Sequence, residues 1–118
     1  MYKEIVHIKS VQEIEAILIK HTDSYYFTDN EIKSVEQKST IKSFGARYLI
    51  KKSILDHLKL GDDYHDIEIE NEADGKPLVR LTRKVRKKAD EMNIGNIQVS
   101  ISHSRNLIST LVVVEENV

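Results

Sequence analysis

The apolar pattern at the N-terminus predicts a strand followed by a helix. Lys3 to Ile8 has an apolar centre between polar residues, which is typical of a short strand. From Val11 onward, apolar residues recur at helical spacing up to about Lys20, and the hydroxyl of Ser10 is placed to cap that helix. We therefore expect the chain to begin with a strand that leads directly into a capped helix.

Two more helices are expected in the first half of the chain, after a polar and aromatic loop from His21 to Tyr26. Thr28 to Glu31 has the capping-box pattern and predicts a short polar helix that ends near Lys38. Thr40 to Leu60 is the most apolar helical stretch, and Gly61 is a natural terminator. One broad face of this helix carries Ile41, Phe44, Tyr48, Leu55 and Leu58, while Ile50 and Ile54 point elsewhere. We expect it to be central.

The second half of the chain is predicted to be mostly extended. Asp74 to Pro77 is a turn signal between two apolar segments, and Ser104 to Asn106 suits a hairpin between two longer ones. The expected elements are strands at His65–Glu70, Leu78–Leu81, Asn96–His103 and Leu107–Glu115, and a basic helix at Thr82–Asn93. Strands that alternate with helices and close in a hairpin favour an α+β fold, with residues 1–118 forming a single domain.

Composition narrows the class of protein without identifying it. The chain has 118 residues, 40% of them hydrophobic, and a formal net charge of −1, so no overall field attracts it to nucleic acid or to an anionic membrane. It has no cysteine, which excludes disulfides, thiolate metal sites and a cysteine nucleophile. No apolar run is long enough to span a bilayer or to serve as a signal peptide. These features predict a soluble cytoplasmic protein.

Two polar segments are candidate anion sites. Ser102, His103 and Ser104 stand at a strand end, and an imidazole flanked by hydroxyls and followed by Arg105 is suited to gripping a phosphate. The alternative is a polar cluster that only satisfies the hairpin turn. The turn from Asp74 to Pro77 offers backbone N–H groups and an ammonium to an anion, or is an ordinary turn. A serine hydrolase is a weaker interpretation, because adjacent residues on a strand face opposite sides.

Cationic side chains of the long helix form a third candidate anion site. Ideal helix geometry places Lys52 about 20° from Ile41, on the apolar face, where it must snorkel, pair or bind an anion. Asp56 offers an ion pair one turn later. Arg47 and Lys51 are also one turn apart, and two such cations suit a phosphate clamp, although an exposed basic stripe is the commoner outcome.

A basic segment in the second half suggests a further alternative. It could bind nucleic acid, dock an acidic protein or be a solvated helix face, and it contains no aromatic residue for stacking on single strands. The five histidines of the chain include no pair at the i,i+4 spacing of a helical zinc site. The six cations of the basic segment are Arg80, Arg83, Lys84, Arg86, Lys87 and Lys88.

Taken together, four segments resemble the holo-(acyl-carrier-protein) synthase type of 4′-phosphopantetheinyl transferase in order and spacing. Phe27–Glu31 resembles "LTEEE", and Gly45–Ser53 resembles "AGRFAAKEA". Gly75–Pro77 matches "GKP", and Asn96–Ser104 matches the "VSISHS/T" strand closely. The acidic end at Val114–Glu116 also fits, so the resemblance covers nearly the whole chain.

The resemblance implies a fold, a reaction and partners. The implied fold is a small antiparallel sheet packed against helices, with a long central helix. The implied reaction transfers 4′-phosphopantetheine from coenzyme A to a serine of an acyl carrier protein, in fatty acid or polyketide biosynthesis, and releases adenosine 3′,5′-bisphosphate. Members of this size usually form trimers with active sites between subunits. Magnesium, held by two carboxylates, neutralises charge in such a transfer.

Eight residues match positions that contact coenzyme A or shape its pocket in the family. They come from the long helix, the glycine turn and the hairpin end: Arg47, Lys51, Gly75, Lys76, Pro77, Ser102, His103 and Ser104.

The implied metal ligands do not match. Tyr2–Ile8 stands in place of "GIDIVEI", so Glu4 replaces one liganding aspartate, and Lys52 replaces the glutamate of "KEA". A protonated lysine does not ligate Mg²⁺ and repels it. Asp56 stands where many members have a phosphate-binding lysine. Ser10 and Glu13 stand where arginines often meet the carrier protein.

Two interpretations remain open. In the first, the ammonium of Lys52 takes the place of the metal, His103 takes part in the chemistry, and transfer continues with or without impairment, while a role for magnesium is in doubt. In the second, the chain is an inactive homologue that binds coenzyme A or an acyl carrier protein as a binding or assembly subunit.

Overall fold

The strand β5 forms the centre of a three-stranded antiparallel sheet, in the order β1–β5–β4, and β2 and β3 form a separate hairpin. The computed structural model describes residues 1–35, 40–72 and 74–117. Its elements in chain order are β1 (Tyr2–Ser10), α1 (Val11–Leu18), α2 (Asp23–Tyr26), α3 (Asp29–Val35), α4 (Thr40–His57), a 3₁₀ turn (Tyr64–Asp66), β2 (Ile67–Asn71), β3 (Pro77–Leu81), α5 (Arg83–Glu91), β4 (Ile94–His103) and β5 (Leu107–Glu116).

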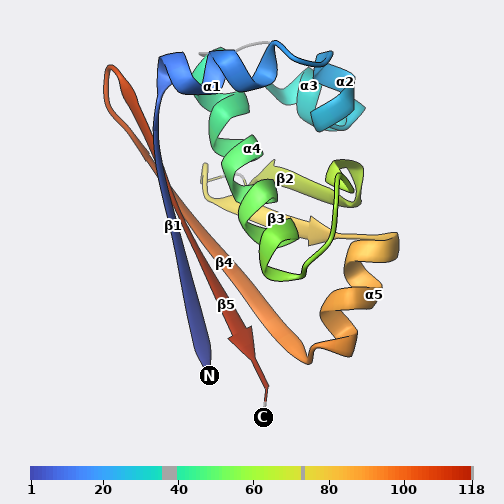
Figure 1. Cartoon of the computed structure of the whole chain (residues 1–118). Coiled ribbons are helices and arrows are strands. Elements are labelled where there is room, and N and C mark those ends of the chain that lie inside the picture. The colour runs from blue at the N-terminus through green and yellow to red at the C-terminus, as the bar shows by residue number, and fades with distance from the viewer. Residues whose placement is uncertain (36–39, 73, 118) are drawn as a thin grey trace.

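The three-stranded sheet has one covered face and one open face. On β5 the buried residues alternate with partly exposed ones, so that Ile108, Val112 and Val114 point into the core. The helices and the β2–β3 hairpin all lie on that inner side of the sheet (Figure 1). Antiparallel sheets tolerate this arrangement because one face can remain uncovered by the rest of the chain. The predicted α+β class is therefore confirmed.

The helix α4 is the central element, as its apolar sequence predicts. It crosses the inner face of the sheet (Figure 1), and strand β3 of the hairpin lies beside β4. Ile50 and Ile54, which lie outside the broad apolar face, are also buried, at 0% and 1% exposed. Their burial agrees with the expectation that a helix apolar over much of its circumference is central. Close approach to β5 and α1 also requires Gly45, since a Cβ there would lie 2.7 Å from Cδ1 of Ile108.

The end of α4 differs from the predicted one. The helix stops at His57, and the backbone of Lys59 takes a left-handed conformation with φ of 57°. The N–H of Leu60 donates to the carbonyl of Leu55 (2.9 Å), and that of Lys59 donates to Asp56 (3.1 Å), which is the Schellman pattern. Gly61, the expected terminator, therefore lies beyond the cap.

Local capping signals were accurate guides to where helices begin. The hydroxyl of Ser10 accepts from the N–H of Glu13 (3.0 Å), and the Glu13 carboxylate accepts from the N–H of Ser10 (3.1 Å). Thr28 and Glu31 form the same reciprocal pair ahead of α3 (3.2 and 3.0 Å). The predicted end of that helix near Lys38 lies outside the described residues.

Two other boundaries differ from the sequence expectation. The segment expected to be a loop from His21 to Tyr26 contains the one-turn helix α2. The strand expected from His65 starts only at Ile67, because the 3₁₀ turn precedes it. Both corrections concern short turns whose formation depends on packing against α4 and the core aromatics rather than on local spacing.

Candidate active site

A cavity of about 490 Å³ lies between the start of α4, the turn between β2 and β3, and the end of β4. These three segments are far apart in sequence, but they meet here because β3 of the hairpin lies beside β4. Five of the residues predicted for the coenzyme A site line this cavity: Arg47, Gly75, Lys76, Pro77 and His103. The structure thus brings together the matched segments of the helix, the turn and the β4 end.

Arg47 is the most unusual of these residues because its side chain is buried but incompletely bonded. The residue is only 5% exposed, and its Nη1 donates to the carbonyl of Ser43 at 3.4 Å. Its Nε has no hydrogen-bond partner among the described residues. Burial lowers the pKa of the guanidinium, while the nearby carboxylate of Glu31 opposes that shift. A buried charged donor without a partner is costly, so this position favours an anionic ligand.

The turn between β2 and β3 presents a second cation to the cavity. Gly75 has φ of +86°, a conformation that suits glycine, and its N–H donates to the carbonyl of Glu72 at 2.8 Å. The side chain of Asp74 accepts from the N–H of Lys76 at 3.0 Å. The turn is therefore fixed by its own residues, and the side chain of Lys76 is exposed at the cavity.

His103 reaches the cavity from the last position of β4. It shares the strand face of Val99 and Ile101, which also line the cavity. Ser102 and Ser104, predicted to share this site, are not among the lining residues. The N–H of Ser104 donates to the carbonyl of Leu107 (3.0 Å), so Ser104 belongs to the hairpin turn.

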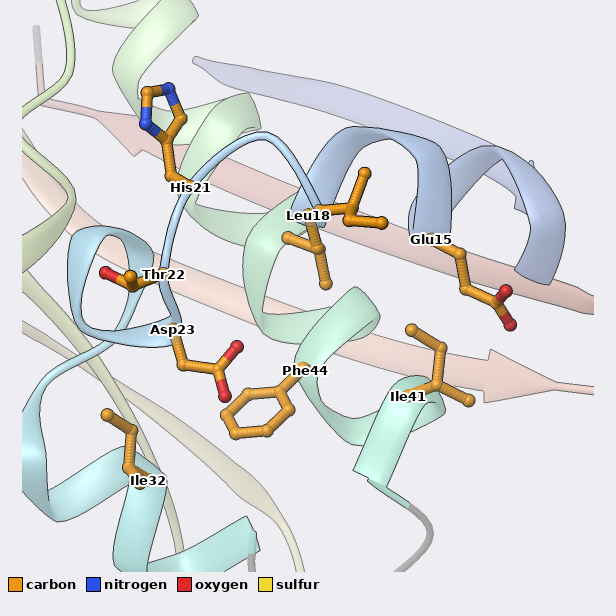
Figure 2. Close-up of a pocket in the computed structure, with 9 residues that line it drawn as sticks. Glu15, Leu18, His21, Thr22, Asp23, Ile32, Ile41 and Phe44 are labelled. Atoms are coloured by element: carbon orange, nitrogen blue, oxygen red, sulfur yellow. The ribbon is translucent and has the colours of Figure 1, made fainter.

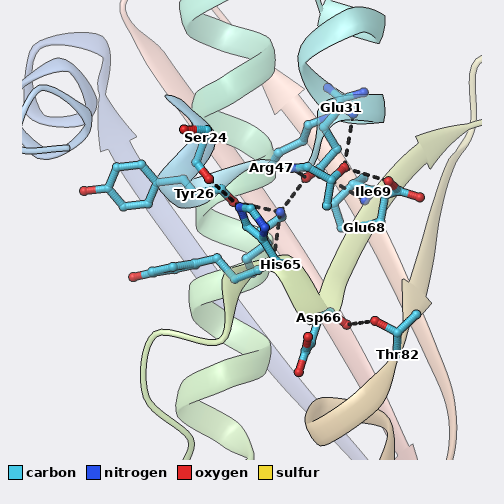
Figure 3. A network of polar contacts seen from close by, with 12 residues as sticks. Ser24, Tyr26, Glu31, Arg47, His65, Asp66, Glu68, Ile69 and Thr82 are labelled. Atoms are coloured by element: carbon cyan, nitrogen blue, oxygen red, sulfur yellow. Dashed lines mark hydrogen bonds and ion pairs between the residues drawn. The ribbon is translucent and has the colours of Figure 1, made fainter. Parts of the chain in front are cut away.

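Lys51, predicted to contact coenzyme A, lies in the interior instead. Its ammonium is fully buried and donates to the carbonyls of Tyr26 (2.8 Å) and Tyr64 (3.0 Å) and to the carboxylate of Glu31 (Figure 3). These three acceptors use all three donors of the ammonium. Burial lowers the pKa of Lys51, and the charge of Glu31 opposes that shift. With its donors taken up in the interior, Lys51 fits neither outcome that the sequence left open, a phosphate clamp with Arg47 or an exposed basic stripe.

Glu31 is the residue that the sequence indicated only as a helix cap. Its Oε1 accepts from Lys51 and from the N–H of Thr28, and its Oε2 accepts from the N–H of Ile69 at 3.0 Å (Figure 3). One carboxylate thus ties α3 to α4 and β2. The sequence did not indicate that Glu31 is the partner of the buried Lys51, because the two residues are 20 positions apart.

Lys52 is half-buried, and its side chain is 42% exposed. Its ammonium pairs with Asp56 at 3.1 Å, which raises the pKa of the lysine. Pairing with Asp56 is one of the outcomes that the sequence left open for this lysine, and it is the one that the structure shows. The inward-facing lysine of α4 is Lys51, about 100° away around the helix.

Glu4, the weakly predicted metal ligand, is exposed on β1 on the same strand face as Val6 and Ile8. The opposite face of β1 meets α4, where Nδ1 of His7 lies 2.7 Å from the hydroxyl of Ser53. No group of three or more His, Cys, Asp or Glu side chains that could hold a metal occurs among the described residues. With Glu4 on the open face and Lys52 paired to Asp56, the residues present do not fit a two-carboxylate magnesium site.

The basic segment around α5 is largely neutralised by neighbouring carboxylates. Four of its six cations form ion pairs in the described part of the chain: Arg80 with Glu70, Arg83 with Asp66, Lys84 with Asp63 and Arg86 with Asp90. This pairing favours the solvated-face interpretation over nucleic-acid binding.

None of the helices in the described residues is both long and apolar enough to cross a membrane.

The structure is an α+β fold with a cavity lined by a central helix, a β-hairpin turn and the end of β4. By sequence, the chain belongs to the holo-[acyl-carrier-protein] synthase family. It is 30% identical over 115 residues to the holo-[acyl-carrier-protein] synthase of Dehalococcoides mccartyi (strain ATCC BAA-2266 / KCTC 15142 / 195), covering 96% of this chain and 95% of that one. It is also 28% identical over 116 residues to the enzyme of that name from Vibrio atlanticus, covering 92% of each.

Solved structures agree with this assignment. The holo-ACP-synthase of Plasmodium yoelii superimposes with a TM-score of 0.80 at 26% identity, covering 99% of this chain and 98% of that one. The synthase of Neisseria meningitidis has a TM-score of 0.82 at 20% identity, covering 96% and 97%, and this likeness concerns the fold. The Helicobacter pylori synthase, solved with coenzyme A, has a TM-score of 0.76 at 22% identity, covering 96% of this chain and 100% of that one. No protein-family model matches the sequence.

Proposed function

We propose that this protein transfers 4′-phosphopantetheine from coenzyme A to a serine of an acyl carrier protein in the cytoplasm. The single observation that carries the proposal is the cavity that gathers Arg47, Lys76 and His103, in which Arg47 is buried and its Nε has no hydrogen-bond partner among the described residues. Coenzyme A carries a pyrophosphate and a 3′-phosphate, and these are the anions that such a constellation suits. Membership in the synthase family supports the same reaction.

The transfer requires one bond to form and one to break. The hydroxyl oxygen of the carrier serine attacks the phosphorus that bears the pantetheine arm, and the P–O bond of the pyrophosphate breaks. Adenosine 3′,5′-bisphosphate leaves, and the hydroxyl proton passes to a base. We assign this base to His103, because a neutral imidazole can accept a proton and this one stands in the cavity.

Coenzyme A binding tests the site directly. Calorimetry should show binding to the wild type and about tenfold weaker binding to Lys76→Gln, because that substitution removes a cation without burying a new group. Lys87→Gln is the matched control, since Lys87 is also exposed but lies on α5. Unchanged affinity in Lys76→Gln would show that coenzyme A does not use this cavity.

Modification of a panel of apo acyl carrier proteins, read by intact mass, tests the transfer. The wild type should add the phosphopantetheine arm, and His103→Asn should retain coenzyme A binding while losing most of the transfer rate. A general base contributes about 10²- to 10⁴-fold to the rate, so the loss should fall in that range. Equal rates for wild type and His103→Asn would remove His103 from the chemistry.

The pairing of Lys52 with Asp56 favours a second candidate function, a binding subunit that keeps the cavity and lacks the chemistry. Substitution Lys52→Glu restores the family's carboxylate at that position and discriminates the two. Transfer by the wild type, measured with and without Mg²⁺, supports the enzyme. Coenzyme A binding without transfer, together with transfer gained in Lys52→Glu, supports the binding subunit.

We also propose that the chain assembles as a homotrimer through the open face of its sheet. Tyr2, Val6 and Ile8 on β1 are 68%, 58% and 59% exposed, and Val6 stands in register with Leu111 of β5. Contiguous apolar side chains on an uncovered sheet face are typical of an interaction surface. The trimers implied by the resemblance support this assembly.

A further inference from the structure

The buried ion pair of Lys51 and Glu31 lies one helical turn from Arg47, which lines the candidate coenzyme A cavity. Neither member of the pair lines that cavity, and the side chains of both are fully buried. Lys51 follows Arg47 by four residues on α4, so the two cations project from the same side of the helix. The pair is therefore placed to act on Arg47 without touching a ligand.

One carboxylate serves both cations. Burial lowers the pKa of the Arg47 guanidinium, and the nearby charge of Glu31 opposes that shift. Figure 3 shows Arg47 and Glu31 in the same network of polar side chains. The oxygens of Glu31 already accept from the ammonium of Lys51 and from the N–H groups of Thr28 and Ile69. Nε of Arg47 consequently keeps no hydrogen-bond partner among the described residues.

The count of charges shows what Lys51 contributes. Two cations share one carboxylate, so this part of the interior has one positive charge in excess. A buried charge without compensation is costly, and an anion bound in the cavity would offset that cost. Without Lys51, the carboxylate of Glu31 would be unpaired, and Arg47 would be the cation left to pair with it. The guanidinium would then be withdrawn from the ligand.

A second cavity beside α4 lacks this feature. It has a volume of about 760 Å³ and lies between α1, α2, α3 and the start of α4 (Figure 2). The described residues that line it include two carboxylates, Glu15 and Asp23, and no lysine or arginine. From α4 it receives the apolar side chains of Ile41 and Phe44 (Figure 2). The excess positive charge is therefore presented to the coenzyme A cavity and not to this one.

We propose that Lys51 is a positioning residue for Arg47: by occupying the carboxylate of Glu31, its ammonium keeps the guanidinium free to bind a phosphate of the ligand. This role rests on the proposed binding of coenzyme A in the cavity. It differs from the direct contact with coenzyme A that the resemblance implies for Lys51, because all three donors of the ammonium are used in the interior.

Coenzyme A affinity, measured by calorimetry, separates this role from a merely structural one. Lys51→Met should weaken binding about tenfold, because Arg47 then pairs with Glu31. Glu31→Gln should bind at least as tightly as the wild type, because the competing carboxylate is gone. The double variant Glu31→Gln/Lys51→Met should bind like the wild type for the same reason. A structural pair would instead weaken binding in both single variants, since each breaks the pair and lowers stability.

Two controls are matched to these variants. Glu15→Gln makes the same substitution as Glu31→Gln at an exposed residue of the second cavity. Leu58→Ala removes a buried apolar side chain just beyond the end of α4 and lowers stability without changing a charge. Both controls should bind coenzyme A like the wild type. Urea denaturation shows which variants are folded, and if Lys51→Met is not, the double variant decides.

Three affinity results would overturn the role of Lys51. They are wild-type affinity in a folded Lys51→Met, a loss in Glu31→Gln as large as that in Lys51→Met, and weakened binding in the double variant. A test without ligand follows the Nε–H resonance of Arg47 by NMR, which should shift in Lys51→Met and return in the double variant. An unchanged resonance in Lys51→Met would also overturn the role. If the wild type does not bind coenzyme A, the proposed function fails, and the resonance still decides whether Lys51 holds Glu31 away from Arg47.

Discussion

At the residue scale, adjacent lysines of α4 have opposite environments, and this yields a stability prediction. Lys51→Met should lower the free energy of unfolding by about 3–5 kcal/mol, because it leaves the buried carboxylate of Glu31 without its cation. Lys52→Met removes the ion pair with Asp56, in which the lysine side chain is 42% exposed. Because exposed ion pairs contribute little, this substitution should change the free energy of unfolding by less than about 1 kcal/mol. Urea denaturation of both variants measures the difference, and equal losses would contradict the buried pair.

A second residue-scale prediction concerns alkaline pH. Burial raises the pKa of Tyr64 far above its ordinary value of 10.0, so the folded state keeps a proton that the unfolded chain releases. The resulting stability is fully present below pH 10 and is lost as pH rises above it. Unfolding free energy measured between pH 8 and pH 11 should therefore fall above about pH 10, and Tyr64→Phe should flatten that fall. An unchanged slope in Tyr64→Phe would assign the effect to other groups.

At the element scale, α5 depends on a residue outside the helix. Asp66 accepts from the N–H of Lys84 (3.1 Å) and from Nε of Arg83 (2.9 Å), so it caps the helix from the 3₁₀ turn. Asp66→Ala should cost about 1–2 kcal/mol of stability in chemical denaturation. The control is Asp90→Ala, which removes an exposed pair with Arg86 and should cost less than about 1 kcal/mol. If Asp66→Ala loses as little stability as Asp90→Ala, Asp66 does not cap α5.

Elements were predictable where their signals are local. The capping boxes at Ser10 and Thr28 were confirmed, since each depends on residues three positions apart. The end of α4 was not predictable, because a left-handed Lys59 replaces the expected glycine and is held by packing of the following Leu60.

The candidate site was also predictable only where its signals in the sequence are local. The segments that form the cavity were identified by motif, whereas the orientations of Lys51 and Lys52 depended on which sides of α4 the rest of the chain covers. Hydrophobic spacing on one helix does not contain that information, because burial is set by elements that are distant in sequence.

At the scale of the whole molecule, the open sheet face leads to the last prediction. Light scattering of the wild type should give three times the chain mass of 13.6 kDa. Val6→Lys should shift that mass toward the monomer, because it places a charge in the apolar row that Val6 forms with Leu111. Leu78→Lys is the matched control: Leu78 is also apolar and exposed, at 43%, but lies on β3 away from the open face.

The two variants separate assembly from folding. Since Val6 is already 58% exposed in the single chain, Val6→Lys should leave the secondary structure intact, which circular dichroism would show. A wild-type mass equal to one chain would contradict the trimer, and it would leave the cavity of Arg47 and His103 as a site completed within one chain. A trimer that survives Val6→Lys would instead move the interface from the open sheet face to another surface.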